Sequence, residues 1–326
     1  MIAALDLGLI FALMALGVYL TFRILDFADL TIDGSFTTGA AAAAIALVAG
    51  WHPGLATALA IAVGVVAGLI TGLLNTLGKI HPLLAGILTQ IALYSINLRI
   101  MGKANIPLLR TGTLFTPLRD AGLQATWASV AILTALVAAF VLALDWFLST
   151  DLGLGLRATG DNEGMARAQG INTDAMKLIG LGLSNGLVAL SGALFAQYQG
   201  YADIGMGIGL IVAGLASVII GTAVFSDGRI WITTIAVVLG SVTYRLIIQI
   251  ALSIRWFDPN DMKLLSALIV VAALVTPRWD VLNRARSRGR QFVVEPWDTP
   301  DPEELDSGDA RPPSTGVTKR TGRKNG

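Results

Sequence analysis

Long apolar runs separated by short polar stretches recur along most of this chain. Runs of roughly 18 or more apolar residues have the length that an α-helix needs to cross about 30 Å of hydrocarbon. They predict membrane-spanning helices at nine places: 2–22, 36–50, 54–78, 83–100, 126–149, 177–199, 207–225, 229–252 and 263–277. The pattern ends near residue 283, beyond which Arg, Pro, Asp, Glu, Ser and Gly predominate. We therefore expect a transmembrane domain over 1–277 and a basic, then Pro- and acid-rich, disordered cytoplasmic tail over 278–326.

The composition agrees with this pattern and narrows the class of protein. Hydrophobic residues make up 54% of the chain and charged residues 14%, and the mean hydropathy is +0.70. These values predict an all-α, polytopic helical membrane protein with about 8 to 9 transmembrane helices. The first run, 2–22, lacks a basic start and a small-residue cleavage site, so we expect it to remain as a spanning helix. With no Cys and two distant His, we expect no metal site.

Basic residues predict the orientation in the membrane. Five arginines follow the last predicted span: Arg278, Arg284, Arg286, Arg288 and Arg290. The positive-inside rule then predicts a cytoplasmic C-terminus, and counting back four spans makes the 150–176 loop cytoplasmic too. The same count makes the N-terminus and the 101–125 loop external, although Lys103, Arg110 and Arg119 in that loop depart mildly from the rule.

Three aspartates, Asp26, Asp29 and Asp33, lie between the first two apolar runs in the stretch RILDFADLTIDGSF. They are simply solvated if this stretch is a cytoplasmic turn. If it is a broken membrane helix instead, each would face a water-filled path, because a charge that faces lipid is costly. The residues alone leave both interpretations open.

Small and polar residues inside the predicted spans also allow two interpretations. Gly64, Gly68 and Gly72 share one helix face, which favours close helix packing over a flexible hinge. Gln90 and Tyr94, with Asn97, fall near one face of the 83–100 helix. They could line a path for a polar solute, or they could form hydrogen bonds between helices.

No catalytic motif is present in the sequence. The nearest phosphate-loop lookalike, GLLNTLGKI at 72–80, has its glycines one residue too far apart and lacks the Ser or Thr that should follow Lys79. No HExxH or GxSxG motif appears. We therefore expect a chain that is not itself an enzyme and that binds no cofactor.

The most polar stretch between the spans is LRATGDNEGMARAQGIN, at 156–172. It predicts a short cytoplasmic helix over 161–169 that Thr159, Asp161 or Asn162 would cap and Gly170 would end. Met165, Ala166 and Ala168 would give this helix a small apolar surface that suits a groove on a partner. A passive connector between two spans is the alternative.

Three stretches resemble the permease subunits of bacterial ABC importers of the branched-chain amino acid and ribose permease superfamily. They are the 156–172 stretch followed by GLSNGLVALSGALFAQYQG, the early ILDFADLTIDGSFTTGAAAAA, and NTLGKIHPLLAGILTQIALYSIN around Pro82. The resemblance covers roughly 2–277. Of the three, the early stretch ILDFADLTIDGSFTTGAAAAA is most similar to an uncharacterised, amino-acid-type subgroup of these permeases.

This resemblance implies a multi-pass permease of the bacterial inner membrane that translocates a small solute, an amino acid or a related molecule. An extracytoplasmic binding protein would deliver the solute, a second permease copy would complete a homodimer, and cytoplasmic ATPase subunits would hold the ATP and Mg²⁺. The implied ATPase-coupling residues are Arg157, Asp161, Asn162, Glu163, Met165, Ala166 and Gly170. The candidate path residues are Asp29, Asp33, Ser35, Gln90, Tyr94 and Asn97. The Arg-rich start of the tail would meet anionic lipid.

Two other functions fit the same sequence. One is a secondary transporter driven by an ion gradient, with Asp26, Asp29 and Asp33 as its proton or cation site. The other is an ABC permease for a sugar such as a pentose. A membrane-embedded enzyme or scaffold is disfavoured, because the sequence contains no catalytic constellation.

Overall fold

A computed structural model describes residues 2–109, 111–224 and 229–253, together with 264, 267, 268 and 271. Its helices are α1 (Ile2–Val18), the π-helical η1 (Tyr19–Ile24), α2 (Thr31–Val48), α3 (Pro53–Thr76), α4 (Pro82–Met101), α5 (Thr116–Asp120), α6 (Trp127–Ser149), α7 (Asp151–Asp161), α8 (Glu163–Ala168), α9 (Thr173–Gln199), α10 (Leu210–Val224) and α11 (Ile230–Ser253). Two short antiparallel strands, β1 (Asn105–Pro107) and β2 (Tyr201–Asp203), pair with Ile106 opposite Ala202. The predicted all-α membrane fold is confirmed for these residues.

Seven helices of the described residues are long and apolar enough to cross a membrane: α1 continued by η1, α2, α3, α4, α6, α9 and α11. The stretch predicted as a span at 207–225 is described as a shorter apolar helix. It begins three residues later than predicted, at Leu210, because turns occupy Met206–Gly209, and α10 is described over 15 residues up to Val224. The span predicted at 263–277 and the tail at 278–326 lie outside the described residues, apart from the four isolated positions.

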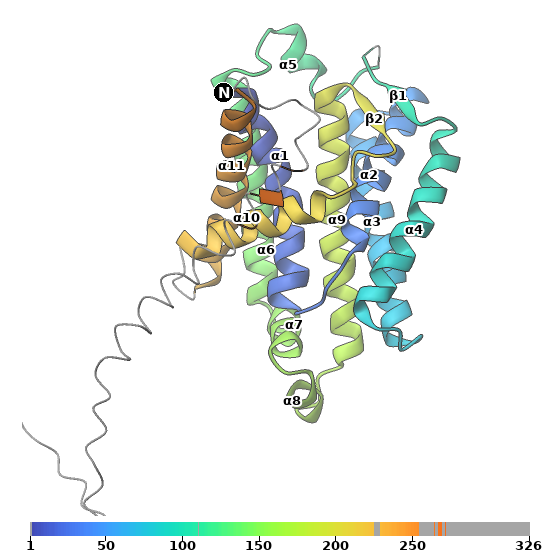
Figure 1. Cartoon of the computed structure of the whole chain (residues 1–326), viewed down its shortest axis with the longest axis vertical. Coiled ribbons are helices and arrows are strands. Elements are labelled where there is room, and N and C mark those ends of the chain that lie inside the picture. The colour runs from blue at the N-terminus through green and yellow to red at the C-terminus, as the bar shows by residue number, and fades with distance from the viewer. Residues whose placement is uncertain are drawn as a thin grey trace, which may run out of the picture. The chain divides into compact units, whose positions relative to one another are not determined.

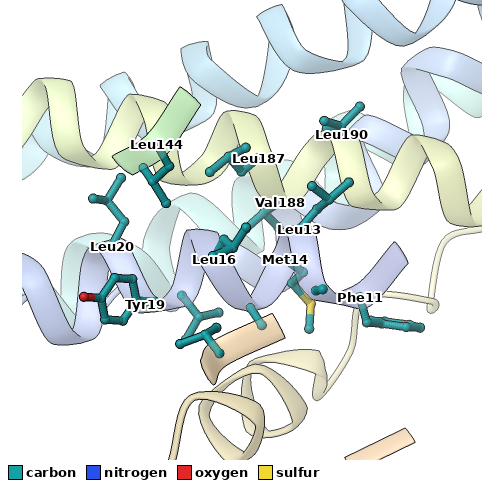
Figure 2. Packing of buried hydrophobic residues seen from close by; sticks show 14 of the residues in the cluster. Phe11, Leu13, Met14, Leu16, Tyr19, Leu20, Leu144, Leu187, Val188 and Leu190 are labelled. Carbon is teal, nitrogen blue, oxygen red and sulfur yellow. The ribbon is translucent and has the colours of Figure 1, made fainter. Parts of the chain in front are cut away.

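The centre of the bundle is α9, which packs against α1, α2 and α3. Leu13 and Leu16 of α1 meet Leu187 and Val188 of α9 in the apolar core that Figure 2 shows. Hydroxyl groups of α9 add bonds between the helices. Ser184 Oγ donates to the carbonyl oxygen of Gly17 at 2.7 Å, which satisfies a polar group inside the apolar core.

Glycines allow α3 and α9 to approach closely. A Cβ at Gly64 or Gly68 would overlap α9 at Ala189 or at the carbonyl oxygen of Leu181, and a Cβ at Gly72 would lie 2.8 Å from Leu178 Cδ2. The three glycines therefore form one face of α3, and this face packs on α9.

The two ends of the bundle differ. Figure 1 shows α7 and α8 at one end, and α5 with the β1–β2 pair at the other. The 150–176 and 101–125 loops are therefore on opposite ends of the bundle, as the predicted topology requires. Arg110 of the second loop lies outside the described residues.

The chain between α1 and α2 does not continue as a helix. After η1 it runs as a non-helical segment, Leu25–Leu30, which we call the interrupted segment. Its second residue, Asp26, has a φ of +51°, a conformation that Asp adopts more readily than most residues. In Figure 1 this segment leads from the α7 end into the bundle, where α2 begins.

Candidate functional site

The 150–176 loop is built from two short helices, each with its own cap. Thr150 caps α7, and the Asn162 side chain accepts a hydrogen bond from the Met165 backbone N–H at 2.9 Å to cap α8. Gly170, with a φ of +84°, follows the end of α8. Of the three predicted caps, Asn162 is thus the one that begins α8.

The predicted helix over 161–169 is longer than the helix observed. α8 covers Glu163–Ala168, and Asp161 is the last residue of α7, a helix that the sequence did not predict. The reason is that α7 begins as DLGLGL, where Gly153 and Gly155 weaken the helical signal. Glycine has a low helix propensity, but tertiary packing outweighs that cost in α7, because both glycines are buried against neighbouring helices. A Cβ at Gly153 would overlap Phe147 and Leu148 at the end of α6.

An ion-pair network joins α8 to the first turn of α9. Glu163 Oε1 lies 2.9 Å from Arg167 Nη2 and 2.8 Å from Lys177 Nζ. Arg167 also donates to the Thr173 hydroxyl at 2.7 Å and approaches Asp174 at 3.5 Å. The hydrogen bond from Lys177, reinforced by the charges of Lys177 and Arg167, lowers the pKa of Glu163 below its ordinary value. A displacement of α8 would therefore be passed to α9.

The outer surface of α8 is open. Met165 has 63% of its surface exposed, and Asp161, Asn162 and Gly170 are exposed around it, whereas Ala166 is buried. The predicted docking residues therefore divide in two. Met165 and its exposed neighbours can touch a partner, and Ala166 holds the helix in place.

The loop also touches the end of the first span. Gly160 of α7 packs directly on the carbonyl oxygen of Ile24, the last residue of η1. Leu156 of the same helix is fully buried, and its Cδ1 would lie 2.8 Å from a Cβ placed at Gly180 of α9. Arg157, beside it, is partly buried. The loop thus contacts both α9 and the start of the interrupted segment.

Asp29 of the interrupted segment is fully buried and is held by two N–H donors. Its Oδ1 accepts from the Thr31 backbone N–H at 2.9 Å, and its Oδ2 accepts from Asn185 Nδ2 of α9 at 2.7 Å. Asn185 Oδ1 in turn accepts from the Ser35 hydroxyl at 2.6 Å. The Thr31 and Thr71 hydroxyls lie 2.7 Å apart, which adds a link to α3. These residues form the Asp29 cluster: Asp29, Thr31, Ser35, Thr71 and Asn185.

Asp33 lies four residues further along, in the first turn of α2, and has a different role. Its two carboxylate oxygens accept from the backbone N–H groups of Gly209 and Ile211, at 2.7 and 2.8 Å. These groups belong to the unpaired donors at the start of α10, so Asp33 caps a helix from another part of the chain. Thr37 adds a bond from the Gly207 N–H at 3.1 Å. Asp26, in contrast, is exposed.

The three candidate path residues on α4 share one edge of that helix but differ in burial. Gln90 is partly buried, and its Cα would lie 3.3 Å from a Cβ placed at Gly34. Tyr94 is 48% exposed. Asn97 is fully buried, and neither of its amide atoms has a hydrogen-bond partner within the described part of the chain. This edge of α4 therefore lies beside the start of α2 at Gln90 and ends at the unsatisfied amide of Asn97.

Sequence reasoning missed two elements of these sites. One is Asn185, and the other is Asp6, a fully buried acid whose Oδ2 accepts from Ser129 at 2.7 Å and from Tyr198 at 3.0 Å. A signal for Asp6 was available: it is a single acid inside the apolar run 2–22, and an acid in such a place requires a polar partner. For Asn185, no pattern indicates which distant acid it will meet.

Comparisons with known proteins agree with this architecture. The family described as "Branched-chain amino acid transport system / permease component" matches residues 1–274. A tyrosine transport system permease protein of Clostridioides difficile is 44% identical over 84% of this chain and 90% of its own length. An uncharacterized protein of Rickettsia prowazekii is 34% identical over 84% and 96%. An autoinducer 2 import system permease protein of Salmonella typhimurium is 29% identical over 52% and 50%. The chain is therefore a membrane transport permease, and it belongs to the branched-chain amino acid transport permease family.

Proposed function

We propose that this chain is the permease subunit of an ATP-driven importer for an amino acid, in the inner membrane of a bacterium and with its C-terminus in the cytoplasm. Two ATPase subunits would bind ATP and Mg²⁺ on the cytoplasmic side, and a binding protein would deliver the solute on the other side. A second copy of this chain would complete the membrane part. The observation that carries the proposal is the exposed α8, which is fastened by ion pairs to the central helix α9.

The contacts of α8 suggest how such an ATPase would drive the permease. A push on Met165 and its neighbours would reach α9 through the bonds of Glu163 with Lys177. α9 would carry it to Asn185, which holds Asp29 and Ser35. The beginning of α2 would then move relative to α4, and this motion fits a switch between two states of access that is biased by nucleotide.

The relatives support an amino acid as the solute. The chain covers 90% of a relative named as a tyrosine transport permease, at 44% identity. The relatives named as autoinducer 2 permeases match over about half of the chain and at 29% identity. An amino acid, with tyrosine as the first compound to test, is therefore favoured over a sugar.

The ion-driven alternative fits the geometry less well. A cation site needs several oxygen atoms that converge without competing donors. Both oxygens of Asp29 and both oxygens of Asp33 accept N–H bonds, and these two acids serve different helices. The described geometry of these aspartates therefore favours structural roles over ion coupling.

Copurification and uptake test the proposal together. The tagged chain, expressed with its neighbouring genes, should copurify with an ATPase subunit. Proteoliposomes that contain this complex should then take up labelled tyrosine only with ATP and the binding protein. A collapsed proton and sodium gradient should leave this uptake unchanged. Uptake by the purified chain alone, driven by an ion gradient, would reject the proposal.

A further inference from the structure

Asp6 is a fully buried acid near the start of α1, at the end of the bundle where Figure 1 also shows α5. Its Oδ2 accepts from the hydroxyl of Ser129, in the first turn of α6, at 2.7 Å. The same oxygen accepts from the hydroxyl of Tyr198, in the last turn of α9, at 3.0 Å. One carboxylate oxygen therefore joins the ends of three helices.

The charge of Asp6 has no counterpart among the described residues. None of their ion pairs includes it. Arg119 approaches the end of α9 by another route, because its Nε donates to Gln124 Oε1 at 3.4 Å and Gln124 Nε2 donates to the Tyr198 carbonyl oxygen at 3.3 Å. A buried carboxylate without a partner cation is strongly disfavoured. Its charge must therefore be balanced by a proton or by a bound cation.

The second carboxylate oxygen distinguishes these two possibilities. Within the described part of the chain, Asp6 Oδ1 is buried and has no hydrogen-bond partner. A proton on Oδ1 would be a donor without an acceptor, and a proton on Oδ2 would leave Oδ1 as bare as before. A cation beside Oδ1 would balance the charge and also occupy the unsatisfied oxygen. Buried polar atoms are normally satisfied, so the cation explains both features.

The atoms around Asp6 are suited to a cation. Ser129 and Tyr198 each donate through a hydroxyl group, whose oxygen keeps lone pairs for a metal ion, whereas the N–H donors on Asp29 and Asp33 have none. The carbonyl groups in the last turn of α9 add the negative end of the helix dipole. A single carboxylate balances a single positive charge, which favours a monovalent ion over Ca²⁺. These are oxygen ligands, unlike the Cys and His ligands whose scarcity predicted no metal site.

We propose that Asp6, Ser129 and Tyr198 bind a monovalent metal cation, Na⁺ or K⁺, which holds the ends of α1, α6 and α9 together. The ring of Phe115, just before α5, packs edge-on against the ring of Tyr198 with 5.4 Å between centroids. The cation therefore also fixes the 101–125 loop on the end of the bundle. Its role is structural and requires no ion gradient, so it is independent of the solute and of the ATPase.

Thermal denaturation of the purified transporter in detergent, where no gradient exists, tests the site. The midpoint is measured in choline chloride, NaCl and KCl at equal ionic strength, and in choline chloride with added CaCl₂. We expect NaCl or KCl to raise the midpoint by about 2–4 °C over choline chloride, and the rise to saturate with concentration, because a ligand that binds only the folded state stabilises it.

Three variants assign the effect to the site. Asp6→Asn keeps the size of the side chain and removes its charge, so the rise should disappear. Asp26→Asn is the matched control, because Asp26 is an exposed acid on the same side of α2, and it should keep the full rise. Tyr198→Phe keeps the ring on Phe115 and loses the hydroxyl, so it should need several-fold more salt for the same rise.

Equal midpoints in choline chloride, NaCl and KCl would overturn the inference, and so would a rise that survives in Asp6→Asn. A larger rise with CaCl₂ at a much lower concentration would reject a monovalent ion. If Asp6→Asn does not fold, Tyr198→Phe decides the matter, because an unchanged salt dependence in that variant would place the cation elsewhere.

Discussion

Asp29 and Asn185 are 156 positions apart in the chain, and their side chains meet at 2.7 Å inside the bundle. The carboxylate belongs to the interrupted segment and the amide belongs to α9. The bond therefore joins the interrupted segment to the helix that follows the 150–176 loop. No ion pair of the described residues neutralises Asp29. The two oxygens of its buried carboxyl group are satisfied by the N–H donors around it.

Asn185→Leu removes one of these donors while keeping the size of the side chain. We expect a loss of about 1–3 kcal/mol in the free energy of unfolding, the cost of a buried acceptor left partly unsatisfied. Tyrosine uptake should slow as well. Thermal denaturation of the purified transporter measures the first effect. The double variant with Asp29→Asn should be less destabilised than the sum of the two single changes. Simple additivity would show that the two residues do not interact.

Asp33→Asn should lower uptake more than it lowers membrane insertion. Asn keeps one carbonyl oxygen, so one of the two N–H bonds to α10 is lost, at about 1 kcal/mol, and Asp33→Ala should lose both. The amount of inserted protein and the uptake rate are measured in the same membranes. Asp26→Asn is the control, because Asp26 is exposed and Asn accepts its positive φ. Equal effects at positions 26 and 33 would refute the capping role.

Met165→Glu should uncouple uptake from ATP hydrolysis and leave stability unchanged. Met165 projects from α8 with 63% of its surface exposed, so an acid there disturbs a partner groove more than the packing within the chain. Leu77→Glu, an equivalent change at an exposed residue after α3, is the control. Uptake and ATP hydrolysis by the complex are compared. Normal coupling in the Met165 variant would leave the loop as a passive connector.

Glu163→Arg and Gly170→Trp should also uncouple uptake from ATP hydrolysis. They are less specific tests of partner docking on α8 than Met165→Glu. The first places a cation beside Lys177 and Arg167, and the second places a bulky residue at a φ of +84°. Both therefore alter the shape of the loop in addition to its surface.

Gly68→Ala should destabilise the bundle by about 1–3 kcal/mol, because the new methyl group would overlap the carbonyl oxygen of Leu181. Gly182→Ala is the matched control in the same α3–α9 interface. Its Cβ would make ordinary contacts, at 3.5 Å from Leu69 Cδ2, and alanine favours the helix by about 1 kcal/mol. Thermal denaturation should therefore separate the two variants. Equal midpoints would show that the two helices can shift apart without cost.

Local sequence information was sufficient for the spanning helices because the bilayer imposes a length and a polarity that a run of residues carries by itself. α9 illustrates this, since it was predicted over 177–199 and is observed over Thr173–Gln199. α10 shows the limit. Its residues are as apolar as those of a full span, and only the turns before it, packed on Asp33 and Thr37, set where it begins.

The sequence by itself determined the class of the protein, its main helices and the polar loop between α6 and α9, because each depends on neighbouring residues. The tertiary structure alone decided the roles of the three aspartates: Asp26 is exposed, Asp29 bonds to α9, and Asp33 caps α10. The physical reason is that a buried carboxylate is stabilised by whichever donors the fold brings to it. The donors from Asn185, Gly209 and Ile211 come from more than 150 positions away.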